Sequence, residues 1–217
     1  MPLALSNSGA LGLSRPSKGA FAALILASAA LLLSACTTTL ASNPDYVMAP
    51  APGPAAMNGS AVIVMDDALQ NDVITAHPTS YTGSATSIVE PIGQIIRDVG
   101  LKILGPAFSN GVTVGTTTKP DAYGVVLRLD AFSYQYDQLS NLGFAITPKV
   151  TVSMTIEAIG PDGKSLFRKT YERKNYTVGA YVASLEPAEK INKSLHLAIG
   201  EIFRDVVDDV KAARSRT

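Results

Sequence analysis

The chain has few side chains that carry reactive chemistry. Its 217 residues include one cysteine, two histidines and no tryptophan. A single cysteine excludes an internal disulfide, and that cysteine together with His77 and His196 supplies neither a zinc ligand set nor a Cys–His nucleophile pair. The 18 basic residues match the 18 acidic ones, so no positive excess indicates a nucleic-acid partner. The composition therefore predicts no metal, no cofactor and no nucleic acid.

Long apolar runs are lacking outside the N-terminal region. Residues 19–33 form an apolar run that follows Arg15 and Lys18. This run is shorter than the roughly 20 residues that cross a bilayer, and no basic residue follows it as a stop-transfer signal. A basic start, an apolar centre and small residues before a cleavage point are typical of a secretory signal peptide.

Residues 33–36, at the end of the apolar run, read LSAC, and the last of them is Cys36, the single cysteine. These four letters resemble the lipobox of bacterial lipoproteins. The resemblance implies that residues 1–35 are a lipoprotein signal peptide, that Cys36 carries a diacylglycerol, and that its amino group takes a further acyl chain such as palmitate. Two or three acyl chains anchor a protein firmly. Thr37 follows where many inner-membrane lipoproteins have aspartate, so the resemblance implies a periplasm-facing place on the outer membrane.

Residues 37–60 are rich in Pro, Ala, Gly, Ser and Thr and carry almost no charge. This composition predicts a flexible tether over residues 36–60, starting at the lipidated Cys36. As a coil it spans about 25–30 Å. The remaining residues, 61–217, suffice for one domain with a core of its own.

Hydrophobic periodicity predicts two amphipathic helices in that domain. Isoleucine and valine recur at helical spacing from Ile88 to Ile103, where Ser87 and Glu90 have capping-box spacing and Pro91 can move the helix start. A second, longer helix is expected at residues 187–212.

Alternating apolar and polar residues predict strands at 61–65, 123–137, 150–158 and 166–178, whereas residues 111–116 read as a loop. Strand 150–158 alternates without an error, so one of its faces should be buried and the other wet. The order β-α-β-β-β-α predicts an α+β fold, with an antiparallel sheet of about four strands covered on one face by two helices.

Three aromatic residues in strand 123–137 allow two interpretations. Phe132, Tyr134 and Tyr136 are out of step with the apolar residues that precede them, which a bulge or a change of face near Ala131 explains. If their rings lie on the face that the helices leave open, they form a contact surface for a partner. If they lie on the covered face, they are core.

The lipobox, the Pro-rich segment, the amphipathic helix, the hairpin from AYGVVLRLDAFSYQYDQ to KSLFRKTYERKNY and the terminal helix together resemble the YajG-type uncharacterised bacterial lipoproteins. The element order is more distantly similar to the envelope-assembly lipoprotein LptE. The resemblance implies a plug, adaptor or assembly factor, and it transfers no catalytic residue.

The expected function is therefore that of a non-enzymatic, lipid-anchored accessory or adaptor for an envelope protein complex. Two alternatives stay open. A small binding module for lipid, glycan or peptidoglycan needs an apolar pocket or a groove with converging polar groups. A hydrolase needs a nucleophile, base and orienting group, which neither Asp66-Asp67 nor Asp208-Asp209 supplies, because neighbouring side chains point in different directions.

Overall fold

The computed structural model describes residues 36–51, 53–81, 83–137, 145–179 and 187–216. The expected signal peptide, residues 1–35, lies outside them. Cys36 to the C-terminus forms one compact unit. No helix in the described part of the chain has the length and apolarity to cross a membrane.

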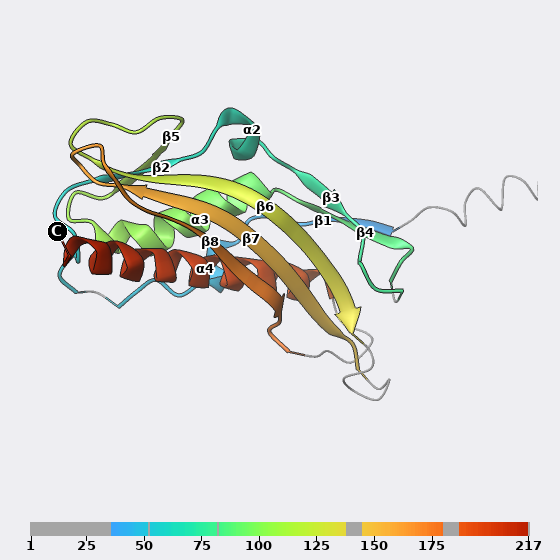
Figure 1. The fold of residues 1–217 in the computed structure, drawn as a ribbon. Coiled ribbons are helices and arrows are strands. Elements are labelled where there is room, and N and C mark those ends of the chain that lie inside the picture. Colours follow the sequence, from blue (N-terminus) through green and yellow to red (C-terminus); the bar gives the residue numbers. More distant parts are fainter. Residues whose placement is uncertain (1–35, 52, 82, 138–144, 180–186, 217) are drawn as a thin grey trace, which may run out of the picture. The chain divides into compact units, whose positions relative to one another are not determined.

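A five-stranded sheet forms the centre of the domain (Figure 1). Its strand order is β5-β2-β6-β7-β8. The bounds of these strands are Ala61–Val64 for β2, Val112–Gly115 for β5, Tyr123–Asp137 for β6, Thr147–Ile159 for β7 and Ser165–Tyr176 for β8. Strands β6, β7 and β8 form the expected antiparallel meander.

The expectation of a purely antiparallel sheet is wrong for the strands on the other side of β6, namely β2 and β5. Strand β2 runs parallel to both β5 and β6. A parallel pair needs a long crossover, which the chain between β2 and β5 supplies with helix α3. Residues 112–115, expected to be a loop, form β5 because their short β-branched run pairs with β2.

Two helices pack on one face of this sheet, as expected. They are α3 (Ile92–Leu104) and α4 (Pro187–Arg214). They approach each other closely at Gly100, where an added Cβ would lie 2.9 Å from Ile63 Cδ1 and 3.0 Å from Phe203 Cζ. The apolar stripes of both helices are buried with the inner face of the sheet. This packing forms the single main core.

Helix α3 begins later than the apolar spacing suggests. Ile88, Ser87 and Glu90 belong to strand β4 (Thr86–Glu90), and Pro91 occupies the N-cap position of α3 without a side-chain cap. The expected capping box is therefore wrong. A residue before proline favours extended backbone, so Pro91 ends β4 and starts the helix.

A second, three-stranded sheet has the order β1-β4-β3, with β1 at Cys36–Thr39 and β3 at Ile74–Ala76. Strand β1 is parallel to β4, and β3 is antiparallel to it. The short helix α2 (Asp67–Gln70) precedes β3 and is capped by Asp66, whose Oδ1 accepts from Leu69 N–H at 2.7 Å. Two short 3-10 helices are η1 (Pro44–Tyr46) and η2 (Gly105–Ala107).

The segment expected to be a tether is packed on the domain instead. We call residues 36–51 and 53–60 the N-terminal strap. A stripe of α4 residues holds it: His196 Nε2 accepts from Asn43 N–H at 2.9 Å, and Asn192 Nδ2 donates to Ala41 O at 2.9 Å. From α3, Lys102 Nζ donates to Pro44 O at 2.8 Å.

Two apolar side chains of the strap, Val47 and Met57, are fully buried. Val47 fits where α4 has Gly200, at which an added Cβ would lie 2.8 Å from Val47 Cγ1. The sequence of the strap has no helical or strand periodicity, so its composition alone predicted a coil. Its hydrogen bonds and its burial come instead from partners on α3 and α4, which are distant in sequence.

We predict that replacing Val47 by serine loosens the strap. The substitution removes buried methyl groups and places a hydroxyl against Gly200, which should lower the free energy of unfolding by about 2 kcal/mol. Limited proteolysis should then cut the strap sooner than in the unchanged chain. The control is Met48→Ser, because Met48 is 81% exposed. Equal stability and equal cleavage of the two variants would contradict the packed strap.

Candidate functional site

The structure places the expected lipidation residue at the start of β1. Cys36 is paired with Thr86, and the register continues through Thr37 with Ser87. Thr37 Oγ1 and Ser87 Oγ share a hydrogen bond of 2.9 Å. The chain is thus fixed to the smaller sheet from its first described residues.

The three expected contact aromatics do not form an exposed patch. The register of β6 against β7 shifts between Leu129 and Ala131, so Asp130 is an extra residue in β6. This bulge sets Phe132 opposite Val152 and Tyr134 opposite Val150, both of which are core residues of β7. The bulge near Ala131 is thus confirmed, and it keeps the aromatics on the helix-covered face.

Tyr134 is 1% exposed and Tyr136 is 7% exposed, whereas Phe132 is partly buried against the core. The ring centroids of Tyr134 and Tyr136 are 5.6 Å apart, and the two rings are nearly perpendicular. The turn before β4 covers them: Thr79 N–H donates to Tyr134 O at 2.8 Å, and Tyr136 N–H donates to Ser80 Oγ at 2.8 Å. The contact interpretation is therefore wrong for Tyr134 and Tyr136, which are core residues.

The opposite face of the meander is polar, as the alternation in β7 predicts. Thr151, Ser153, Thr155 and Glu157 all lie half-buried on this face. Thr155 Oγ1 donates to Asp130 Oδ2 at 2.6 Å and shares a hydrogen bond of 2.8 Å with Thr170 Oγ1. These threonine and carboxylate contacts tie the three strands together on the side away from the core.

A polar seam joins β8 to α4. Arg173 bridges Asp205 at 2.6 Å and Glu201 at 3.1 Å. Tyr171 Oη donates to Asp209 Oδ2 at 2.6 Å, and the pKa of this phenol is raised, chiefly by burial and then by that carboxylate. Asp209, from the adjacent carboxylate pair in α4, thus has a structural partner.

Both histidines have structural contacts. His77 Nδ1 lies 3.1 Å from Thr86 O. His196 is fully buried, and its Nδ1 lies 2.8 Å from Asn192 O while Nε2 accepts from Asn43 N–H. Burial lowers the pKa of His196. Among the residues that the structure describes, no cluster of three His, Cys, Asp or Glu could hold a metal ion.

Glu90 is an ionisable residue that sequence reasoning considered only as a helix cap. It ends β4, its side chain is 0% exposed, and neither carboxyl oxygen has a hydrogen-bond partner among the described residues. Burial raises the pKa of Glu90 to about 8. The carboxyl is therefore neutral at pH 7 in the folded chain.

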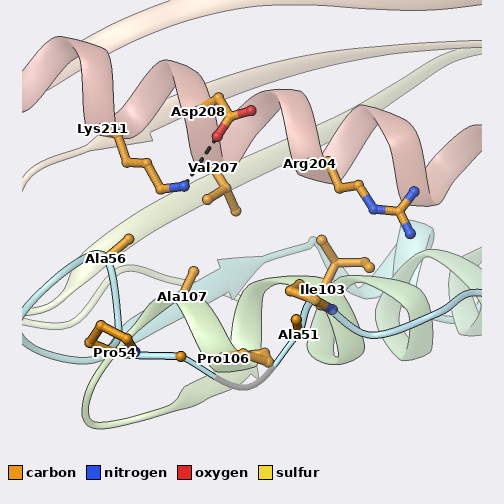
Figure 2. A pocket seen from close by; sticks show the side chains of 12 residues that line it. Ala51, Pro54, Ala56, Ile103, Pro106, Ala107, Arg204, Val207, Asp208 and Lys211 are labelled. Atoms are coloured by element: carbon orange, nitrogen blue, oxygen red, sulfur yellow. Dashed lines mark hydrogen bonds and ion pairs between the residues drawn. The ribbon is translucent and has the colours of Figure 1, made fainter.

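A groove of about 400 Å³ lies between the strap and the C-terminal halves of α3 and α4 (Figure 2). Its apolar floor includes Ile103, Ala107 and Val207. The strap contributes one wall, made of Pro50, Ala51, Gly53, Pro54 and Ala56. No sequence signal marked this groove, because it exists only when the strap is packed.

Three charged residues of α4 form the rim of the groove. Lys211 Nζ lies 3.1 Å from Asp208 Oδ1, and Arg204 Nη2 donates to Met48 O of the strap at 3.0 Å. Asp208 has 76% of its side chain exposed and Lys211 has 46% exposed. The groove thus combines an apolar floor with charges of both signs at a rim that is accessible to solvent.

We predict that Glu90 makes the domain less stable as pH rises. From pH 4.5 to about 8, Glu90 ionises in the unfolded chain but stays protonated in the folded one. The free energy of unfolding should therefore fall by up to about 5 kcal/mol over this range. Glu90→Gln should remove this slope in urea titrations at several pH values. Glu157→Gln, on the open sheet face, should keep it, and an unchanged slope in Glu90→Gln would contradict the assignment.

Comparison with known proteins gives likenesses of structure at low sequence identity. No family model and no curated protein matches the chain. A protein from Xanthomonas campestris described under DUF330 is 10% identical, covering 83% of this chain and 97% of its own, with a TM-score of 0.49. An uncharacterized protein is 9% identical over 80% of this chain and 99% of its own, with a TM-score of 0.42.

A minor lipoprotein from Acinetobacter baumannii is 11% identical, covering 71% of this chain and 94% of its own, with a TM-score of 0.35. These values establish neither a family nor a function for this chain. The YajG-type resemblance therefore stays a prediction.

Proposed function

We propose that the chain is a bacterial envelope lipoprotein, anchored to the outer membrane by acyl chains on Cys36, and that it serves as a non-catalytic accessory or adaptor for an envelope protein complex. The observation that carries the proposal is the run LSAC at the end of a signal-like apolar segment, with the folded unit beginning at that same cysteine. A lipidated first residue leaves the whole domain on one side of the bilayer.

The contacts of the ionisable residues support a non-catalytic role. Both nitrogens of the His196 imidazole have contacts: Nε2 accepts from Asn43 N–H of the strap, and Nδ1 lies 2.8 Å from Asn192 O within α4. Arg173 and Tyr171 use their polar groups to join β8 to α4. Each of these three side chains thus contacts a second element of the fold, and the buried carboxyl of Glu90 is the exception, because it has no hydrogen-bond partner among the described residues.

The groove is the best-supported contact surface for a partner. It offers apolar area next to a charged rim, a combination that protein interfaces use for burial and for specificity. It also replaces the aromatic patch as the candidate docking site, because the structure buries Tyr134 and Tyr136.

The groove also favours one alternative function, a small binding module. Its volume of about 400 Å³ lies within the range of ligand pockets, and its apolar floor with Arg204 and Lys211 at the rim suits an amphiphile with a negative group. A protein partner and a small ligand would compete for the same surface, so one set of variants tests both.

The lipid anchor predicts a defined mature N-terminus. Mass spectrometry of the membrane-extracted protein should show a chain that begins at Cys36 and carries acyl chains. Cys36→Ser should leave the membrane fraction or retain residues 1–35, because the acyl acceptor is lost. A Cys36→Ser chain of mature length that still fractionates fully with membranes would contradict the anchor.

Filling the groove should abolish binding without unfolding the domain. Ala51 is an exposed residue of the strap wall, so Ala51→Arg adds bulk to the groove and should change the free energy of unfolding by about 0.5 kcal/mol or less. Crosslinking in intact envelopes should lose the partner in Ala51→Arg. The control, Ala131→Arg, places the same side chain at the exposed bulge of β6 and should retain it. If Ala51→Arg loses one small ligand that the unchanged protein binds, and neither protein crosslinks to a protein partner, the binding-module alternative is favoured over the adaptor.

A further inference from the structure

The start of β1 and the turn between β3 and β4 lie at the same end of the domain (Figure 1). Strands β1 and β4 are parallel and begin side by side, with Cys36 opposite Thr86. Neighbouring strands are about 4.8 Å apart. The proposed lipidation residue, Cys36, therefore lies beside the first residue of β4, which directly follows this turn.

The turn presents one exposed aromatic side chain. Tyr81 is 96% exposed, the highest value among the exposed large hydrophobic residues of the described chain. It precedes Thr86 by five positions, so its Cα lies within about 17 Å of Thr86 even if the chain between them is fully extended. A single exposed aromatic is ordinary on a protein surface, but this one belongs to the turn that leads into the strand paired with Cys36.

Contacts with the large sheet hold this turn in place. Thr79 and Ser80 are hydrogen-bonded to the backbone of Tyr134 and Tyr136, respectively. Thr86 N–H donates to Gly83 O at 2.8 Å, and Gly83 has φ of +76°, which glycine adopts readily. The position of Tyr81 is thus set by the fold near the anchor.

The packed strap removes the spacer that the sequence suggests. With Cys36 to Thr39 in a strand, no flexible residues separate the lipidated residue from the domain. A coil of the expected length would have held the domain about 25–30 Å from the bilayer. Acyl chains inserted at Cys36 must instead bring the end of the domain that contains the β3–β4 turn to the lipid headgroups.

We propose that this end of the domain is a membrane-contact surface, with the Tyr81 ring in the headgroup region of the bilayer that the acyl chains enter. The inference rests on the proposed lipid anchor at Cys36 and adds an orientation to it. Tyrosine suits this position because its ring is apolar while its hydroxyl stays hydrated, which is why it is enriched at membrane interfaces.

The same orientation keeps the groove away from the bilayer. The strap follows α4 from its start: Leu40 and Ala188 line the same surface pocket near the first turn of α4. Further along the helix, Arg204 donates to Met48 O of the strap. Arg204 lies roughly 24 Å further along α4 than Ala188, by the rise of an α-helix. Lys211, at the groove rim, lies further still. The membrane-contact surface and the groove are thus separated along the length of α4.

The experiment uses the full chain, acylated in a bacterial host and reconstituted into vesicles of phosphatidylethanolamine and phosphatidylglycerol. Acylation consumes the thiol of Cys36, so Tyr81→Cys provides a single free thiol for an environment-sensitive NBD label. Emission should shift to the blue in vesicles and be quenched by lipids that carry a nitroxide near the headgroup. Met48→Cys, labelled in the same way, is the control, because Met48 is 81% exposed and lies beside Arg204. Its emission should neither shift nor be quenched.

A spacer variant tests the cause. Insertion of about 20 Gly and Ser residues between Cys36 and Thr37 supplies a coil of roughly 25 Å. It should abolish quenching at position 81 while vesicle binding remains. Mass spectrometry of each sample separates the two proposals. An acylated, vesicle-bound chain in which both labels stay equally water-exposed overturns the membrane-contact surface alone, and a chain without acyl groups overturns the anchor and this inference together.

Discussion

The close packing of α3 and α4 on one face of the large sheet is the constraint on which the rest of the structure depends. Gly100 lets α3 approach both Ile63 of the sheet and Phe203 of α4, because an added Cβ would lie only 2.9 Å from Ile63 Cδ1 and 3.0 Å from Phe203 Cζ and would force these side chains to shift. The two helices then present adjacent surfaces to the strap. Lys102 from α3 and His196 from α4 bind its backbone from these surfaces. Without this helix pair, neither the strap nor the groove beneath it would have a floor.

The packed strap changes what the N-terminal residues can do. A free tether would separate anchoring from the domain, so that the domain could take any orientation over the membrane. A strap joined to β4 at one end and to α4 along its length instead makes Cys36, the proposed lipidation residue, part of the folded domain. The same segment forms a wall of the groove, so that the proposed lipid anchor and the proposed contact surface share one structural element.

Burial decides which polar residues serve structure and which remain accessible. Arg173 and Tyr171 complete a seam between β8 and α4, and His196 is enclosed between α4 and the strap. Glu90 is enclosed, and its carboxyl has no hydrogen-bond partner in the described part of the chain, so the folded state loses stability when the pH favours ionisation of this group. In contrast, Asp208 and Lys211 pair at the groove rim and remain open to solvent.

Local patterns in the sequence predicted the meander β6-β7-β8, the terminal helix α4 and the wet face of β7, because periodicities of 2 and 3.6 reflect burial on one side of an element. Phe132, Tyr134 and Tyr136 show the limit of such patterns. Their phase change indicated a bulge, but only the register with β7 assigned them to the covered face. The parallel pairing of β2, the folding of residues 36–60 as a strap and the groove rest on contacts between residues distant in sequence. Such contacts leave no periodic trace in a single chain, so the tertiary structure alone determines them.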